Sequence, residues 1–358
     1  MKSMYEYICE SDKAVRNIIN NRLAIYKALK DRPNIKKMKS VFLAGSGTSY
    51  HASLASACAC ENILHVPARA VMAMEFVDSV NVIPADSLVI GISQGGRSTS
   101  TMNALRKGRD HGCVTIAITS DLHSPVASVA DITIELMVGE EDMGPKTKGY
   151  FCSVATIIVL SEAIALLKGE PAISEETLYH ELLSCADVIP PIAVKAKAFY
   201  EQNRQIFLQS RKIFVVGYMS SVASAYEGAL KILETVNCPV QGFEMEEFMH
   251  GIYHAVDENT LIIWLGADQY HYRRMLGLLH YLQQHKHCSS VLITSDQSAD
   301  VMPVMQFPFV KDNLFEGLEY IVPVQVIAEQ MASDRGIDLT VSTDPDFHRE
   351  MGSYCYEK

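Results

Sequence analysis

Several features that mark common protein classes are missing from this 358-residue sequence. We find no apolar run of the roughly 18 residues that a membrane span needs, and the first residues lack the apolar core of a signal peptide. No Gly-Lys-Ser/Thr triplet occurs, which excludes a nucleotide-binding loop of that kind. No Cys-x-x-Cys pair occurs, and nine scattered cysteines favour reduced thiols in a cytoplasmic protein.

Excess positive charge is also missing. The formal net charge is −11, so the chain has no basic field with which to neutralise a nucleic-acid backbone. Apolar residues make up 48% and charged residues 20%, which is ordinary for a globular protein, and the length suffices for two domains. These values leave room for a small phosphorylated ligand, because such a ligand needs only a local site.

Short β-branched runs alternate with amphipathic helical segments along the chain. This alternation predicts an α/β fold with parallel sheets covered by helices on both faces. In such folds ligands bind beyond the carboxyl ends of the strands. The predicted strands are residues 41–44, 88–92, 114–119, 132–136, 213–216, 261–265, 291–294 and, more weakly, 305–309.

An internal duplication divides the chain. Residues 41–49 match residues 213–221, and the Thr-Ser-Asp that ends at Asp121 returns at Asp296. We therefore predict a helical arm with Ser11 as an N-cap, two related lobes with a boundary near Ile189-Pro-Pro-Ile, and a tail. The predicted bounds are 1–35 for the arm, 36–192 and 193–340 for the lobes, and 341–358 for the tail.

One loop points to phosphate binding. Ser93-Gln-Gly-Gly-Arg-Ser98 follows the predicted strand 88–92 and precedes a helical segment over 99–109. Small residues at the start of a helix expose backbone N–H groups and hydroxyls to an anion. The second lobe has Trp264-Leu-Gly-Ala-Asp268 at the matching place, without serines or paired glycines. We therefore expect the second lobe to contribute something other than phosphate binding.

The second lobe offers an acid–base helix. After a Ser-Ser N-cap, the predicted helix 222–236 places Glu227, Lys231 and Glu234 on one face. An arbitrary Glu-Lys-Glu stripe is usually a solvated, salt-bridged surface. This stripe starts just beyond the end of a strand, where a half-buried carboxylate could move a proton.

Two histidines follow that helix. His250 and His254 are four residues apart, a spacing that could hold a metal on a helix. Gly251 weakens a helix between them, and no third ligand stands out. We therefore predict no metal site, and for a single histidine a structural role is the default.

Five blocks stand out in order along the chain, namely Gly47-Thr-Ser-Tyr-His51, Ser93-Gln-Gly-Gly-Arg-Ser98, Thr147-Lys148, Glu227-Gly-Ala-Leu-Lys-Ile-Leu-Glu234 and Glu247-Phe-Met-His-Gly251. Together they resemble the double sugar-isomerase (SIS) proteins over nearly the whole chain. The resemblance is closest to the isomerase half of glutamine-dependent glucosamine-6-phosphate synthases and to deglycases of Amadori compounds. It implies two tandem SIS domains, each a three-layer α/β/α unit of flavodoxin-like or Rossmann-like type.

The resemblance implies roles for individual residues. Glu234 would move a proton between C1 and C2, Lys231 would steady the enediol-type intermediate, and His250 would open the sugar ring. That histidine commonly comes from the neighbouring subunit in the family, which implies a homodimer or a higher oligomer. The implied phosphate and sugar contacts are Thr48, Ser49, Ser93, Gln94, Ser98 and the amide of Gly95.

The sequence also departs from the family pattern. Gly95 replaces a serine of the loop and Arg97 replaces a glutamate. We expect no glutaminase domain, and the tail from Asp344 lacks the catalytic lysine of the synthases. Lys358, the last residue, is a poor substitute for that lysine.

These departures favour a deglycase that cleaves a 6-phosphorylated ketosamine into an aldose 6-phosphate and an amine. The alternatives are an isomerase or deaminase of amino-sugar phosphates, and a sugar-phosphate sensor without turnover. None of these readings needs a cofactor, because proton transfer beside a carbonyl needs only an acid, a base and electrostatic support. Arg97, Tyr218 and the tail are candidates for shaping the pocket, while the amine and the sugar configuration stay open.

Overall fold

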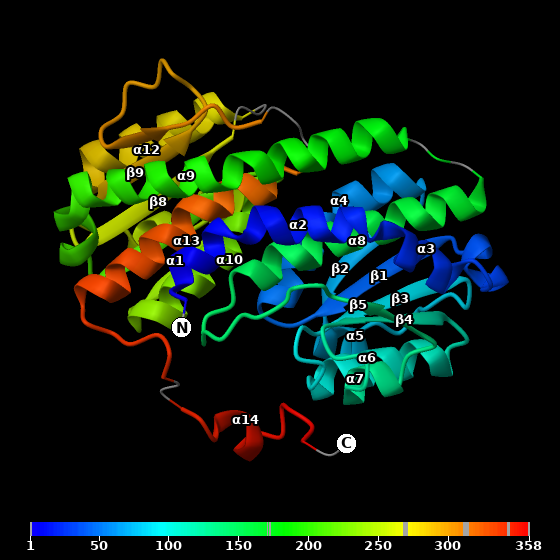
Figure 1. Ribbon diagram of the computed structural model, residues 1–358. Helices are drawn as coiled ribbons and strands as arrows, with labels where there is room; N and C mark the ends of the chain where they lie inside the picture. Colours follow the sequence, from blue (N-terminus) through cyan, green and yellow to red (C-terminus); the bar gives the residue numbers. More distant parts are fainter. Residues whose placement is uncertain are drawn as a thin grey trace. The chain divides into compact units, whose positions relative to one another are not determined.

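Two compact units make up the part of the chain that the computed structural model describes, namely residues 2–169, 171, 173–267, 271–310, 315–341 and 344–356 (Figure 1). The N-terminal sheet unit comprises the described residues of Ser11–Glu141, Lys148–Leu183 and Ser342–Lys358. The C-terminal sheet unit comprises those of Met1–Glu10, Asp142–Thr147 and Ser184–Val341.

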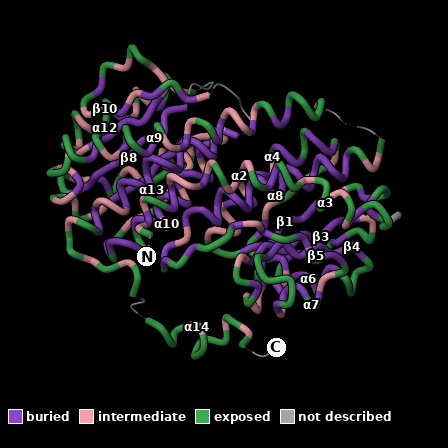
Figure 2. Tube along the Cα trace, viewed as in Figure 1, coloured by how far each residue is buried: buried purple, intermediate pink, exposed green. Residues whose placement is uncertain are grey.

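The N-terminal sheet unit is built on five parallel strands in the order β2-β1-β3-β4-β5. Every residue of β3 is buried, which explains its uninterrupted apolar sequence (Figure 2). The strand order is flavodoxin-like, and its switch point lies between β1 and β3. The strands are β1 Ser40–Gly45, β2 Ala68–Met72, β3 Ser87–Ile92, β4 Val114–Thr119 and β5 Ile132–Glu135.

Helices cover both faces of this sheet. α4 packs against α8, and α5 packs against α6 on the other face (Figure 1). The helices are α2 Ser11–Asn20, α3 Arg22–Leu29, η1 Pro33–Lys37, α4 Thr48–Leu64, α5 Ala73–Ser79, α6 Thr99–Asp110, α7 Pro125–Ser128, α8 Lys148–Lys168 and α14 Phe347–Glu350.

Helix α8 corrects one expectation from the sequence. We expected no apolar run of membrane-spanning length. Among the described residues, however, α8 is a helix that is long enough and apolar enough to cross a membrane. In this structure 89% of its apolar window is buried, and α2, α3 and α4 pack against it. The expectation was wrong because small polar residues interrupt the run but leave the helix apolar enough on average to pass this test. Two of their hydroxyls, those of Ser153 and Ser161, donate to carbonyls one turn back.

The C-terminal sheet unit repeats the same topology. Its strand order is β10-β9-β8-β6-β7, so β6 and β8 stand where β1 and β3 stand in the first sheet. All seven residues of β8 are buried, including Trp264. The strands are β6 Lys212–Gly217, β7 Val240–Glu244, β8 Thr260–Gly266, β9 Ser289–Thr294 and β10 Val304–Gln306.

Two central helices pack closely in this unit. α10 lies against α13, where a side chain at Gly228 would come within 2.6 Å of Val324. The double proline that we expected near the lobe boundary lies inside α9. The helices are α1 Met4–Cys9, α9 Glu175–Gln209, α10 Ser221–Val236, α11 Met245–Phe248, η2 Ile252–Ala255, α12 Tyr272–Lys286 and α13 Glu316–Asp334, and α9 begins in the N-terminal sheet unit.

The sequence predicted the inner strands and missed two edge strands. β2 and β7 carry no continuous apolar run, and each has only one or no fully buried residue. Their half-exposed positions leave no strong pattern to detect. At the N-terminus, Ser11 is the first residue of α2 rather than its cap, and Ser3 caps the preceding α1 through a capping box.

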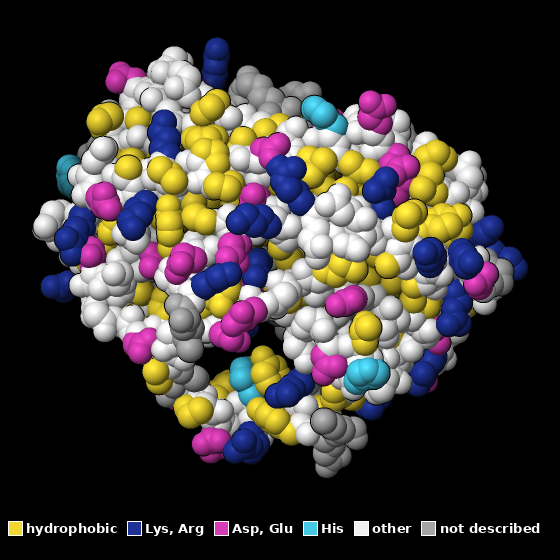
Figure 3. Space-filling model, viewed as in Figure 1, with side chains coloured by type: hydrophobic (Ala, Val, Ile, Leu, Met, Phe, Trp, Pro, Cys, Tyr) yellow, Lys and Arg dark blue, Asp and Glu magenta, His cyan; other side chains and the backbone are white. Residues whose placement is uncertain are grey.

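Charges of both signs share the surface. On the face drawn in Figure 3, lysine and arginine side chains alternate with aspartate and glutamate side chains. At the right-hand edge of that view several lysine and arginine side chains gather.

Candidate functional site

The loop of residues 93–98 joins β3 to the N-terminus of α6. Ser98 is the N-cap of α6, and its hydroxyl accepts hydrogen bonds from the backbone N–H of Thr101 at 3.3 Å and from the Thr101 hydroxyl at 3.1 Å. Gly96 adopts a φ of +65°, and a side chain there would collide with Ser124. The loop can take this shape because glycine stands at that position.

The same loop also presents uncommitted donors, that is, backbone N–H groups that no described residue accepts. Four of its backbone N–H groups make no hydrogen bond to any described residue, those of Gln94, Gly95, Arg97 and Ser98. A row of such groups at the positive end of a helix suits an anion. Open space surrounds the position that a side chain on Gly95 would occupy, so packing does not require the loss of the family's serine.

The loop after β1 lies beside the first loop. The Ser46 hydroxyl is 3.2 Å from the Ser100 hydroxyl, which in turn is 2.9 Å from that of Ser98. Thr48 and Ser49 are half-buried and open α4 immediately after this contact. The two loops flank the switch point of the sheet, where open α/β folds bind ligands. The structure thus brings together the predicted phosphate-site residues of this unit.

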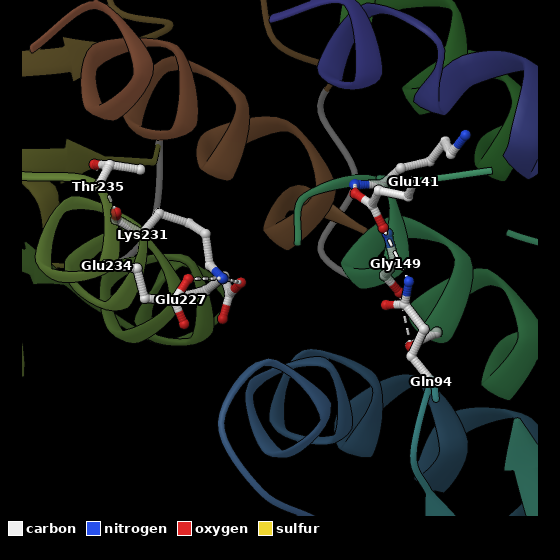
Figure 4. A network of polar contacts seen from close by, with 9 residues as sticks. Gln94, Glu141, Gly149, Glu227, Lys231, Glu234 and Thr235 are labelled. Carbon is white, nitrogen blue, oxygen red and sulfur yellow. Dashed lines mark hydrogen bonds and ion pairs between the residues drawn. The ribbon is translucent and has the colours of Figure 1, made fainter. Parts of the chain in front are cut away.

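Gln94 points in a direction that the sequence did not reveal. Its side-chain Nε2 donates to Oε2 of Glu141 at 3.0 Å (Figure 4). Glu141 is buried, and it also accepts the backbone N–H groups of Lys148 and Gly149 at the start of α8. We did not single out Glu141 from the sequence. The available signal was an acidic residue shortly before a long apolar helix.

The tail packs onto the loop of residues 93–98 within the N-terminal sheet unit. Tyr354 forms an antiparallel bridge with Ser98. The carbonyl of Ser353 accepts the backbone N–H of Thr99 at 3.1 Å, and Cys355 donates to the carbonyl of Arg97 at 2.8 Å. Tyr354 also stacks on His348 with ring centroids 3.9 Å apart. The tail thus lies along the first residues of α6. Lys358 lies outside the described residues.

The acid–base helix α10 belongs to the C-terminal sheet unit. Glu227 and Lys231 are buried, and the Lys231 Nζ lies 2.6 Å from Oε2 of Glu234 and 3.4 Å from Oε1 of Glu227 (Figure 4). The Glu234 side chain is 36% exposed, so it alone of the three carries substantial open surface. The Glu-Lys-Glu stripe is therefore salt-bridged, as such stripes usually are. Unlike the usual solvated stripe, most of it is buried.

Burial and charge act in opposite directions on Lys231. Burial disfavours the ammonium, but the carboxylates of Glu227 and Glu234 more than offset that effect and raise the pKa of Lys231. Lys231 is therefore an ammonium at neutral pH. It places a fixed positive charge directly beside the partly open carboxylate of Glu234.

The predicted cap of α10 differs in detail from the structure. Ser220 makes no side-chain capping bond, whereas the Ser221 hydroxyl donates to Leu265 at 3.3 Å and accepts from Tyr218 at 2.9 Å. Tyr218 contacts the ring of His271. Asp268, which we used to compare the second lobe with the first, lies outside the described residues.

His250 and His254 do not share one helix. His250 is exposed in the turn after α11, Gly251 has a φ of +132°, and His254 lies in the 3-10 turn η2. The i, i+4 geometry considered for a metal pair therefore does not form. Among the described residues, no group of three or more metal-binding side chains comes together.

Comparisons with known proteins agree with this architecture. A family model described as SIS domain matches residues 34–166 and 206–301. Glutamine–fructose-6-phosphate aminotransferase [isomerizing] 2 of Mus musculus is 24% identical over 349 residues, which cover 94% of this chain and 50% of that protein. The corresponding aminotransferase of Clostridium tetani is also 24% identical, over 94% of this chain and 57% of that protein. This chain thus spans about half the length of the curated relatives it matches.

Solved structures give the same picture. A proposed phosphosugar isomerase from Clostridium difficile 630 superposes with a TM-score of 0.88 and 28% identity over the whole of both chains. The C-terminal domain of glucosamine-fructose-6-phosphate aminotransferase from Francisella tularensis has a TM-score of 0.85 at 22% identity, over 95% of this chain and 98% of that one. With matches spanning β1 to β5 and β6 to β9, this chain belongs to the SIS domain family.

Proposed function

We propose that this protein is a phosphosugar deglycase. Its substrate would be a 6-phosphorylated ketosamine, and its products an aldose 6-phosphate and a free amine. The single observation that carries the proposal is the arrangement on α10, where the buried ammonium of Lys231 lies 2.6 Å from the partly open carboxylate of Glu234. The similarity to aminotransferases and phosphosugar isomerases supports the substrate class.

In the proposed reaction, the phosphate binds the open N–H groups and hydroxyls of residues 93–98 together with Thr48 and Ser49. His250 assists ring opening, and we propose that it does so for the site of a neighbouring subunit in a homodimer. Glu234 then removes a proton from C1 of the open ketosamine and leaves an enaminol. The ammonium of Lys231 stabilises the developing negative charge.

The remaining steps return the proton and release the amine. Protonation at C2 converts the enaminol into the imine of the aldose 6-phosphate. Water adds to this imine, and the C1–N bond breaks to give the aldehyde and the amine. The overall balance is one ketosamine 6-phosphate and one water for one aldose 6-phosphate and one amine, with no redox change and therefore no need for an organic cofactor.

We place the reaction in the cytoplasm and assign the tail a part in the site. The nine cysteines all lie among the described residues and form no disulfide, which suits a reducing compartment. The tail lies along the start of α6, close to the proposed phosphate site. In this proposal, the tail residues and Arg97 select the amine.

The test measures aldose 6-phosphate released from a panel of phosphorylated ketosamines, such as fructoselysine 6-phosphate. We expect release of glucose 6-phosphate from at least one ketosamine. Turnover of glucosamine 6-phosphate or fructose 6-phosphate alone would replace the deglycase with an isomerase or deaminase. Absence of turnover on every compound would favour a sensor.

A variant at Glu234 tests the assigned base. Glu234→Gln keeps the shape of the side chain but removes the proton acceptor, so we expect turnover to fall by about 10²-fold or more while binding of inorganic phosphate is retained. Glu258→Gln, at an exposed position in the turn before β8, serves as the control and should leave turnover unchanged. Unchanged turnover in Glu234→Gln would refute the role given to Glu234.

A further inference from the structure

The carboxylate of Glu141 is a buried centre of hydrogen bonding beside the phosphate loop. Its Oε1 accepts the backbone N–H of Lys148 at 2.7 Å, and its Oε2 accepts that of Gly149 at 3.2 Å and the Nε2 of Gln94 at 3.0 Å (Figure 4). The first two donors belong to the positive end of α8, which stabilises a negative charge. A carboxylate fits this place because both of its oxygens accept hydrogen bonds.

Gln94 is held at both of its ends. Its backbone carbonyl accepts the Ser120 hydroxyl at 2.6 Å, the Ser120 N–H at 2.9 Å and the Thr119 hydroxyl at 3.3 Å. Its side chain is held by Glu141 and lies directly on Gly149. Any side chain at Gly149 would come within 1.9 Å of the Gln94 Oε1.

Fixing the carbonyl of Gln94 also fixes the next N–H. In a trans peptide the C=O of one residue and the N–H of the next point in opposite directions. Because the Gln94 carbonyl points toward the end of β4, the N–H of Gly95 points away from it, and no described residue accepts that N–H. That N–H is one of the uncommitted donors of the proposed phosphate site.

We infer that Glu141 is a positioning residue for phosphate binding. It acts through Gln94, whose side chain it anchors, and so fixes the direction in which the 94–95 peptide presents its N–H. The backbone of Gln94 thus contributes to phosphate binding, while its side chain is hydrogen-bonded to Glu141. The inference rests on the proposed use of residues 93–98 as the phosphate site and adds a residue outside that loop.

A double-mutant cycle on the full chain tests the inference, with inorganic phosphate as the probe and ³¹P NMR titration as the measurement. Glu141→Gln puts an NH₂ group where a hydrogen-bond acceptor is needed, and Gln94→Met removes the amide at nearly constant size. We expect each single variant to weaken phosphate binding about tenfold, the equivalent of about 1.4 kcal/mol. The double variant should also bind phosphate only about tenfold more weakly than the wild type, because both changes break the same hydrogen bond between Gln94 and Glu141.

Asp131→Asn is the matched control. Asp131 also accepts two hydrogen bonds in this unit, from the N–H and hydroxyl of Thr115. Thr115 lies at the start of the inner strand β4, whereas the loop of residues 93–98 follows the carboxyl end of the neighbouring strand β3. This variant should leave phosphate affinity unchanged even where stability falls. Circular dichroism before titration verifies that each variant is folded.

Three outcomes would overturn the inference: wild-type phosphate affinity in Glu141→Gln, a roughly hundredfold loss in the double variant, or no phosphate binding by the wild-type protein. The readout is independent of turnover. A protein without deglycase activity that shows the expected cycle would refute only the proposed reaction. Turnover with normal phosphate binding in Glu141→Gln would refute only the positioning role.

Discussion

Lys231 shows how one buried charge depends on its immediate neighbours. Its ammonium is almost completely buried, and two glutamates on the same helix surround it at 2.6 and 3.4 Å. An unpaired ammonium in such a place would be strongly unfavourable. In the proposed reaction the partly open Glu234 takes up and returns a proton, and the fully buried Glu227 remains beside Lys231 throughout.

We expect Glu227→Gln to lower the free energy of unfolding by about 3 kcal/mol, because it leaves a buried ammonium with one partner instead of two. Denaturant unfolding at pH 7 measures the loss. Glu175→Gln is the control, because it breaks the more exposed pair with Arg22 and should cost less than about 1 kcal/mol. Equal losses in the two variants would contradict the structural role of Glu227.

At the scale of the elements, three helices end on a residue with the same left-handed backbone conformation. α4, α10 and α12 close on residues with left-handed backbone angles, namely His65, Asn237 and His287. Glycine is the residue that adopts this conformation without steric cost, and asparagine tolerates it. The two histidines therefore carry a local cost at these helix ends.

His287→Gly is expected to raise the free energy of unfolding by about 1 kcal/mol, because it removes the left-handed strain after α12. Thermal and denaturant unfolding would both report the gain. His285→Gly, two residues earlier and inside α12, should instead lower stability by about 1 kcal/mol. A loss of stability in His287→Gly would show that the histidine side chain makes a compensating contribution.

For the molecule as a whole, duplication of one topology has produced two sheets with different chemistry. Both sheets have the same strand order, with the switch point between β1 and β3 in one and between β6 and β8 in the other. The N-terminal sheet unit has the open N–H groups of residues 93–98, while the C-terminal sheet unit has the buried ion pairs of α10. In the proposed function, anion binding and proton transfer are thus divided between the two halves of the chain.

The stability of the whole chain should also carry a pH dependence from Glu162. Glu162 accepts the Tyr179 hydroxyl at 3.0 Å through Oε2, and its Oε1 has no hydrogen-bond partner among the described residues. Burial raises the pKa of Glu162, although the bond from Tyr179 acts in the opposite direction. A raised pKa in the fold gives stability that is present below the unfolded pKa and lost as pH rises through the folded pKa.

Glu162→Gln removes this titration while keeping an oxygen that accepts from Tyr179. We therefore expect the variant to gain stability over the wild type as pH rises from 5 to 8. The free energy of unfolding of both proteins, measured at the two pH values, gives the comparison. A difference that does not change with pH would show that Glu162 titrates alike in the folded and unfolded chain.

The sequence alone determined the inner strands, the repeated topology and the residues that make up the two motifs. β3 and β8 are continuous apolar runs because they are buried on both faces, and the 93–98 loop is recognisable because glycine and serine are needed there. The spacing of Glu227, Lys231 and Glu234 placed them on one helical face. These features are local, so a short stretch of sequence carries them.

Only the tertiary structure decided which of these groups are buried and what they contact. Helical spacing is the same for a solvated stripe and for a buried one, so the packing of α10 had to show that Lys231 is enclosed. Gln94 meets Glu141, and the tail meets residues 97–99, across long stretches of chain. Such contacts depend on how distant segments come together, and neither periodicity nor a motif within one segment encodes that.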